Sequence, residues 1–165
     1  MKGIRKPYVK NPLEPHARRA FIKFFKERNN IELIENPDQF GIDLVSKRFS
    51  VELEGRNCWR GGDFRYDTVS LLERKKEKDY LKSPVPGFFV AYNNKSFEPP
   101  FQDCEMLITP LIILRKYINA KLVETDAYNV PKDVEAPELR VEVPLNEWKK
   151  LVMKKEIIER TKNGS

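Results

Sequence analysis

Residues 41–54 contain two short runs of alternating apolar and polar side chains, joined by a basic stretch. A period of two places successive side chains on opposite faces of a β-strand, and two such runs separated by a few polar residues are typical of a β-hairpin. A turn at Lys47-Arg48 pairs residues whose numbers sum to 95, so that Leu44 faces Val51. Ile42 is then expected on the same face as Leu44. The sequence therefore predicts two antiparallel strands in a fixed register.

Three carboxylates lie on the other face of this predicted hairpin. Asp43 faces Glu52 directly, and Glu54 follows two residues further along. Side chains directly opposite each other have Cβ atoms about 5 Å apart, and like charges in these positions destabilise a sheet. Mg²⁺ favours carboxylate, water and phosphate oxygens, and it can polarise a phosphodiester and activate the attacking water. The pattern therefore favours metal-assisted hydrolysis with Mg²⁺ or Mn²⁺, although a hairpin with one face in solvent gives the same alternation.

The rest of the chain predicts an α/β fold. A helix is expected from Pro15 to Arg28, because Pro suits the first helical turn and Phe21, Phe24 and Phe25 recur at helical spacing. Further strands are expected at 31–34, 88–93, 105–110 and 138–144, and further helices at 71–82, capped by Ser70 and Glu73, and after Asn146. The order of helix, three strands, helix and strand, with C-terminal additions, is typical of a layered domain with a mixed central sheet.

Composition indicates a single soluble domain in the cytoplasm. The 165 residues are 40% hydrophobic and 34% charged, which argues against disorder, and no apolar run approaches the ~20 residues of a membrane span. The N-terminus lacks the apolar stretch of a signal peptide, and two cysteines make neither a disulfide framework nor a zinc quartet. We expect a basic N-terminal arm at 1–12 and a flexible tail at 160–165. Because His16 is the one histidine, a nuclease that needs two is excluded.

The net charge of +6 favours a polyanionic partner. Lysine and arginine side chains neutralise phosphates and release counterions, which is the sequence-independent part of nucleic-acid binding. A solvated surface with no binding role is the alternative reading. The candidates for nucleic-acid contacts are Arg56, Arg60, Arg65, Arg74, Lys75 and Lys76. The stretch at 57–67 combines arginines with aromatic side chains, which suits stacking on bases as well as a packed loop.

The segments 41–45 and 51–56 together resemble the PD-(D/E)xK nuclease superfamily, which includes restriction endonucleases and archaeal-type Holliday junction resolvases. "GIDLV" is similar to the strand that carries the family's Asp, and "VELEGR" to the strand that carries its acid-x-Lys motif. The resemblance implies a restriction-endonuclease-like core of helix, three-stranded meander, helix and strand over residues 13–110. It also implies that Asp43 and Glu52 hold Mg²⁺ and that a homodimer cuts nucleic acid, first of all DNA. The C-terminal third has no counterpart in the family.

The chain departs from the family at Glu54, which stands where Lys is usual. Some restriction enzymes of the superfamily carry Glu there, so the resemblance implies that Glu54 is a second metal ligand or a general base. Lys75, in the helix expected at 71–82, is the catalytic candidate for the missing cation, and Arg56 is another. The set implied as catalytic is therefore Asp43, Glu52, Glu54 and Lys75.

Other assignments stay open at this point. Asp38 is an alternative strand acid, although Pro37 favours a turn there. A second frame takes Glu54 and Arg56 as the acid-x-base motif. Glu14, at the start of the first helix, is either an additional ligand or an acid favoured by the helix dipole. The alternative function is a non-catalytic nucleic-acid-binding protein that keeps the nuclease fold.

Overall fold

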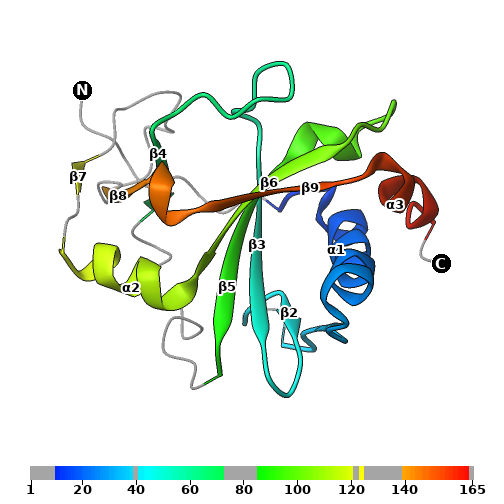
Figure 1. Ribbon diagram of the computed structural model, residues 1–165, viewed down its shortest axis with the longest axis horizontal. Helices are drawn as coiled ribbons and strands as arrows, with labels where there is room; N and C mark the ends of the chain where they lie inside the picture. The colour runs from blue at the N-terminus through cyan, green and yellow to red at the C-terminus, as the bar shows by residue number, and fades with distance from the viewer. Residues whose placement is uncertain (1–9, 39–40, 73–84, 121–122, 125–138, 164–165) are drawn as a thin grey trace.

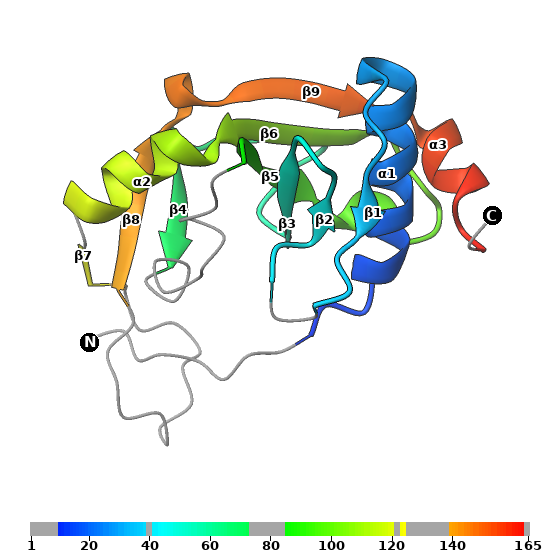
Figure 2. The same cartoon turned by 90° about the horizontal axis from the view of Figure 1, so that it is seen from below.

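The computed structural model describes residues 10–38, 41–72, 85–120, 123–124 and 139–163. Within these residues the chain forms two β-sheets and three α-helices, as Figure 1 and Figure 2 show. The helices are α1 (Glu14–Asn29), α2 (Leu111–Ala120) and α3 (Lys155–Arg160), and the 3₁₀ turns are η3 (Asn94–Phe97) and η4 (Leu145–Glu147). The strands are β1 (Ile34–Glu35), β2 (Leu44–Val45), β3 (Ser50–Arg56), β4 (Thr68–Leu72), β5 (Gly87–Asn93), β6 (Cys104–Pro110), β7 (Val123–Glu124), β8 (Leu139–Pro144) and β9 (Lys149–Met153).

The larger sheet has the strand order β1-β2-β3-β5-β6-β9, and the smaller has the order β4-β8-β7. In the larger sheet β1, β2 and β3 form an antiparallel meander, β3 and β5 run parallel, and β6 and β9 are antiparallel to their neighbours. A parallel pair needs a long crossover connection, and residues 57–86, which include β4, provide it. The predicted α/β class with a mixed central sheet is therefore confirmed.

Helix α1 covers one face of the larger sheet. Its buried side consists of Ala17, Ala20, Phe21, Phe24 and Phe25, which share a core with Leu44, Val51, Leu53, Val90 and Tyr92 of the strands. Pro15 lies in the first turn, and Asn30 in the left-handed conformation ends the helix. The helix predicted from Pro15 to Arg28 is therefore confirmed. Helix α3 packs beside α1 on the same side of the sheet.

The opposite face of the larger sheet packs against the smaller sheet and α2. This second core joins Phe89 and Ala91 of β5 to Val69, Leu71, Val141 and Val143 of the smaller sheet and to Leu111 and Leu114 of α2. Figure 1 shows α1 and α3 on one side of the larger sheet and α2, β4 and β8 on the other. Because the sheet is covered on both faces, β3 and β5 at its centre bury side chains in both directions.

Most of the predicted strands are confirmed within about one residue at each end. The segments expected at 88–93, 105–110 and 138–144 are β5, β6 and β8. The first strand is shorter than the predicted 31–34 and begins later: it consists of Ile34 and Glu35, which pair with β2. Helix α2 was not predicted, although Leu111 and Leu114 are buried at helical spacing.

The helix predicted at 71–82 is wrong at its start. Leu71 and Leu72 belong to β4, and residues 73–82 lie outside the described part of the chain. Ser70 is not a helix cap: it is a strand residue whose Oγ donates a hydrogen bond to Glu142 on β8 at 2.9 Å. Val69 and Leu71 are buried, which is the alternation of a strand.

The helix predicted after Asn146 is also wrong. Asn146 lies in the 3₁₀ turn η4, and the next residues form β9, which pairs with β6 at one edge of the larger sheet, as Figure 2 shows. Trp148 and Leu151 have the spacing of one helical face, but they pack into the two different cores of the molecule. Pairing with a strand distant in sequence outweighs local spacing here.

The C-terminal residues expected as a flexible tail are partly packed. Thr161 is buried, and its Oγ1 donates to the Ile157 carbonyl at 2.7 Å. Arg19 of α1 donates to the carbonyls of Thr161 and Lys162. Residues 160–162 therefore belong to the folded domain. Of the arm predicted at 1–12, residues 10–12 are described. None of the helices in the described ranges is long and apolar enough to cross a membrane.

Candidate functional site

The hairpin of β2 and β3 has the predicted register. Leu44 pairs with Val51, and the turn is closed by the Ser46 amide, which donates to the Phe49 carbonyl at 2.8 Å. The prediction that Ile42 shares a face with Leu44 is wrong. Ile42 packs in the core on the smaller-sheet side, whereas Leu44 packs against α1. β2 begins only at Leu44, so regular alternation does not extend to Ile42.

Asp43 lies at this break, directly before β2, and its carboxylate is held on both oxygens. Oδ2 accepts a hydrogen bond from the backbone amide of Leu53 at 2.7 Å, and Oδ1 accepts one from Nη2 of Arg18 at 2.7 Å. The side chain is only 7% exposed. The carboxylate thus hydrogen-bonds the β3 backbone two residues beyond the Leu44–Val51 pair, and it links that strand to α1.

Glu14, in the first turn of α1, completes a small network of charges with Arg18 and Asp43. Arg18 Nη2 donates to Glu14 Oε1 at 3.3 Å. Burial raises the pKa of the Glu14 carboxyl above its ordinary value of 4.5, and the negative charge of Asp43 raises it further, as does a hydrogen bond between the two carboxyls. Arg18 opposes this increase. Burial lowers the pKa of Arg18, but the charges of Asp43 and Glu14 outweigh that effect and raise it.

Glu52 and Glu54 lie on the side of β3 that points away from α1. Glu52 alternates with Val51 and Leu53, whose side chains pack against α1, and its neighbour on β5 is Phe89 of the second core. Although the register places Asp43 level with Glu52, the Asp43 carboxylate is held on the α1 side. Among the described residues, no three Asp, Glu, His or Cys side chains lie close enough together to hold a metal ion. The predicted ligand set Asp43, Glu52 and Glu54 is therefore not assembled as one cluster.

Arg56 is the last residue of β3 and contacts Glu54 of the same strand. Nη2 of Arg56 lies 2.7 Å from Oε1 of Glu54, and it also donates to the Ser70 carbonyl on β4. Glu54 and Arg56, the pair of the alternative acid-x-base frame, thus form an ion pair on β3. The guanidinium links the larger sheet to the smaller one.

Tyr92 on β5 is buried in the core beside α1, and it pairs in register with Gly55 of β3. Its hydroxyl is buried and has no hydrogen-bond partner among the described residues. Burial raises the pKa of this phenol above its usual range, and the charge of Glu14 adds to the increase. The backbone of β3 approaches the ring closely, since a Cβ on Gly55 would lie 2.9 Å from the ring and 2.5 Å from Oδ1 of Asn94. Only glycine therefore fits at residue 55 without a shift.

The loop at 57–67 lies beyond the end of β3 and carries two arginines and two aspartates, so its formal net charge is zero. Arg60 and Asp63 exchange backbone hydrogen bonds at 2.9 and 3.0 Å across a turn of two glycines in the left-handed region. Oε1 of Glu105 on β6 accepts bonds from the Trp59 indole at 3.2 Å and the Phe64 amide at 3.3 Å. Arg60, Arg65 and Tyr66 are exposed. The other predicted contacts, Arg74, Lys75 and Lys76, lie outside the described residues.

Arg18 was not among the predicted site residues, and Glu14 was one of the open alternatives. Their spacing of four residues, with the acid first, is the available signal, because such pairs meet on one face of a helix. Tyr92 gave no signal apart from its place in a buried strand.

Comparisons of the chain with protein-family models, curated proteins and solved structures found no match.

Proposed function

We propose that this protein is a metal-dependent endonuclease that hydrolyses phosphodiester bonds in nucleic acid, first of all DNA. The observation that carries the proposal is the position of Asp43. Its carboxylate accepts a hydrogen bond from the amide of Leu53, the residue that follows Glu52 on β3, and it contacts Glu14 of α1. The resemblance to PD-(D/E)xK nucleases assigns the metal-binding Asp and the acid of the following strand to Asp43 and Glu52.

The arrangement of the strands supports the proposal. Helix α1 is followed by the antiparallel meander of β1, β2 and β3, as the resemblance implies. The next strand of the larger sheet, β5, lies beside β3 and parallel to it. The helix that the restriction-endonuclease-like core would place between them falls largely in residues 73–84, outside the described part of the chain. The core is therefore part of the proposal, and the C-terminal strands β8 and β9 are additions to it.

The donor chemistry at Asp43 fits a hard divalent cation. Glu14 and Asp43 are two carboxyls in contact, and the pKa of Glu14 is raised by burial and by the charge of Asp43, a repulsion that a bound cation would offset. Mg²⁺ is commonly held by one or two carboxylates with water and phosphate oxygens completing its shell. The resemblance assigns Asp43 and Glu52 as ligands. Glu14 is the carboxyl in contact with Asp43, whereas Glu52 points to the other side of β3, so one ion bound by both Asp43 and Glu52 requires a change in this arrangement. Bound Mg²⁺ or Mn²⁺ would polarise the phosphodiester and lower the pKa of the attacking water.

The remaining catalytic roles are assigned by the same resemblance. Glu54 is proposed as a second ligand or general base, and its partner Arg56 brings positive charge to the same strand. Lys75 is proposed as the catalytic cation that replaces the usual Lys. Arg60 and Arg65, exposed on the ordered loop at 57–67, are proposed to bind the phosphate backbone, with Arg74 and Lys76. A homodimer would place two such sites on the two strands of duplex DNA.

The Arg18–Asp43 ion pair favours a second candidate function. Arg18 already neutralises the proposed metal ligand at 2.7 Å, as expected for a nuclease fold that has lost its metal. The alternative is therefore a non-catalytic protein that binds nucleic acid through the same arginine and lysine side chains.

Supercoiled plasmid incubated with Mg²⁺ or Mn²⁺, and separately with EDTA, tests the proposal. A metal-dependent endonuclease converts the plasmid to nicked and linear forms only with the metal. Asp43→Asn should abolish cleavage, whereas Glu98→Gln, on an exposed loop, should cut like the wild type. Cleavage by neither protein, together with salt-sensitive DNA binding by both, would favour the non-catalytic alternative.

A further inference from the structure

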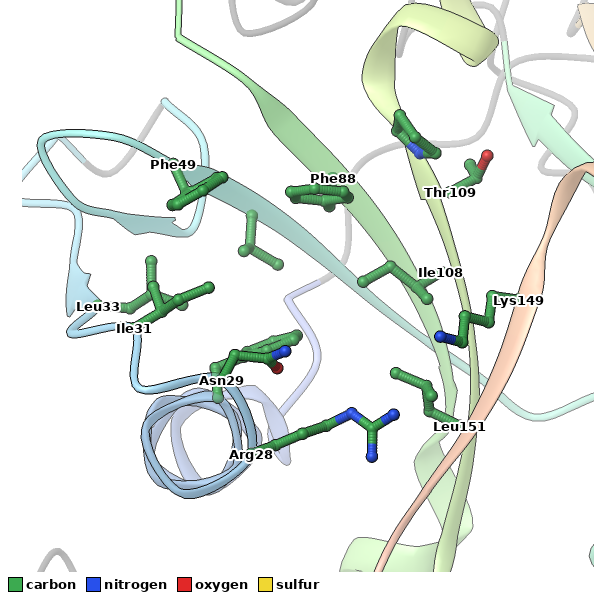
Figure 3. Close-up of a pocket in the computed structure, with 13 residues that line it drawn as sticks. Arg28, Asn29, Ile31, Leu33, Phe49, Phe88, Ile108, Thr109, Lys149 and Leu151 are labelled. Atoms are coloured by element: carbon green, nitrogen blue, oxygen red, sulfur yellow. The ribbon is translucent and has the colours of Figure 1, made fainter.

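A cavity of ≈ 350 Å³ lies between the C-terminal end of α1 and the larger sheet (Figure 3). Cavities of ~300–1,000 Å³ are the size that holds small ligands. Its walls are mainly apolar, with Phe25, Leu33, Phe49, Phe88, Ile108 and Leu151 among them. Glu14 and Asp43 lie toward the other end of α1, so the cavity is separate from the carboxylate site.

Two cations from different elements stand at the opening of this cavity. Figure 3 shows Arg28 reaching from the end of α1 and Lys149 from the start of β9 toward the same space. Both side chains are exposed, and within the described residues neither forms an ion pair or a side-chain hydrogen bond. The described residues that line the cavity include no Asp or Glu. Two unbalanced positive charges beside an apolar space create a potential that attracts an anion.

One polar group of the cavity wall is already hydrogen-bonded within the protein and is not free to bind a ligand. Thr109 is buried, and its hydroxyl donates to the Glu147 carbonyl at 2.8 Å. The Asn29 side chain, which Figure 3 shows in the wall near Arg28, adds an amide to the two cations. Charge is thus confined to the opening, and the interior offers apolar contact.

We propose that this cavity binds a small amphipathic carboxylate, of the medium-chain fatty-acid class. The hydrocarbon chain lies against the aromatic and aliphatic walls, and the carboxylate lies between Arg28 and Lys149. A guanidinium can bind a carboxylate through two parallel hydrogen bonds, and an ammonium adds a point charge. Each CH₂ that leaves water strengthens binding about fourfold. The inference is independent of the proposed nuclease activity.

Calorimetric titration of the full-length protein with three ligands of one chain length tests the charge of the site. Octanoate, octanol and octyltrimethylammonium share the apolar body and differ in the head group. Octanoate should bind about tenfold or more tightly than octanol, because charge-assisted hydrogen bonds are lost in the alcohol. Octyltrimethylammonium should not bind.

Substitutions at the opening locate the site. The double variant Arg28→Gln with Lys149→Gln should weaken octanoate binding about tenfold or more and leave octanol binding unchanged. Lys150→Gln is the matched control, because Lys150 is the next residue of β9 but lies by Glu105, 4.0 Å away, and does not line the cavity. Leu151→Trp should fill the cavity and reduce the affinity for both ligands, with urea denaturation confirming that the fold is kept.

Three results would overturn the proposal. The first is no heat of binding for octanoate at millimolar concentration, and the second is wild-type affinity in the double variant. The third is a dimer in sedimentation velocity that Leu151→Arg dissociates, since a second copy of the chain would then cover the cavity. Plasmid cleavage should be the same in the double variant and the wild type, so this test and that of the nuclease proposal can fail separately.

Discussion

Arg18 of α1 and Asp43, which directly precedes β2, form an ion pair with 2.7 Å between Nη2 and Oδ1. The second oxygen of Asp43 accepts the Leu53 amide of β3 at the same distance. One buried carboxylate therefore fixes the position of the helix relative to the hairpin. The residue proposed to bind the metal is thus also a structural residue, so that activity and stability have to be measured together.

Asp43→Asn should lower both plasmid cleavage and stability. The amide keeps the shape of the side chain but removes the charge that balances Arg18, which is only 25% exposed. Within the described residues, Arg18 then keeps only its longer contacts with Glu14 and Glu35, at 3.3 and 3.9 Å. This loss should cost about 1–3 kcal/mol in the free energy of unfolding, measured by urea denaturation. Cleavage should be lost under conditions where the variant is fully folded. Asp38→Asn, on the exposed turn before the strand, is the control; loss of cleavage in that variant instead would support the other frame.

Glu14 should make stability depend on pH. Because the pKa of Glu14 is raised above its ordinary value of 4.5, the folded state holds this proton to higher pH than the unfolded state does. The contribution is present below pH 4.5 and is lost as the pH rises through the folded-state pKa. Glu14→Gln removes it, so the stability of the variant relative to the wild type should increase as the pH is raised from about 4 to 7. A pH-independent difference in urea denaturation would contradict the raised pKa of Glu14, which comes first from its burial and then from Asp43.

Arg60→Gln combined with Arg65→Gln should weaken DNA binding and make it less sensitive to salt. For duplex DNA, each lost phosphate contact should reduce the slope of log K against log salt by about 0.9. Fluorescence anisotropy of a labelled duplex at several salt concentrations measures both effects. Arg160→Gln, in the last turn of α3 near Glu27, should leave the slope unchanged. An unchanged slope in the double variant would remove the loop at 57–67 from the binding surface.

Glu54→Gln should lower the cleavage rate by about 10²-fold or more, which is the scale of general-base loss. The fold should survive, because Glu54 is half-buried and the amide can still accept a hydrogen bond from Arg56. Glu54→Lys is a sharper probe, since it restores the residue common in the family but places it against Arg56. If Glu54 holds a metal, the Lys variant should lose activity and bind Mn²⁺ more weakly in calorimetry. Full activity in the Gln variant would instead favour Arg56 or Lys75.

Local patterns predicted the parts of the fold whose partners are close in sequence. The α1 helix, the register of Leu44 with Val51 and the buried strand β5 all follow from period and turn signals within about twenty residues. β4 and β9 were assigned wrongly, because each pairs with a strand far along the chain. Ser70 and Asn146 are good helix caps in isolation, and only the distant partner strand decides against that role.

In the candidate site, too, only the relationships between residues close in sequence were predictable. Spacing alone placed Asp43 level with Glu52, and alternation put Glu52 and Glu54 on one side of β3. The contacts of Arg18 and Tyr92 with this region depend on how α1 and β5 are set against the sheet, which no local pattern encodes. The break in alternation at Ile42 was likewise hidden, since an apolar residue fits either of the two cores.

The pairing of β4 with β8 has a consequence for the order in which the molecule can be completed during synthesis. Val69 and Leu71 enter the ribosomal exit tunnel long before Val141 and Val143, the residues that cover them in the smaller sheet. The core beside α1 can begin to assemble once β6 is made, but the core beside α2 has to wait for the last quarter of the chain. A nascent chain stalled near residue 120 should therefore expose an apolar sheet face and bind a holdase chaperone, and synthesis of β8 should free it.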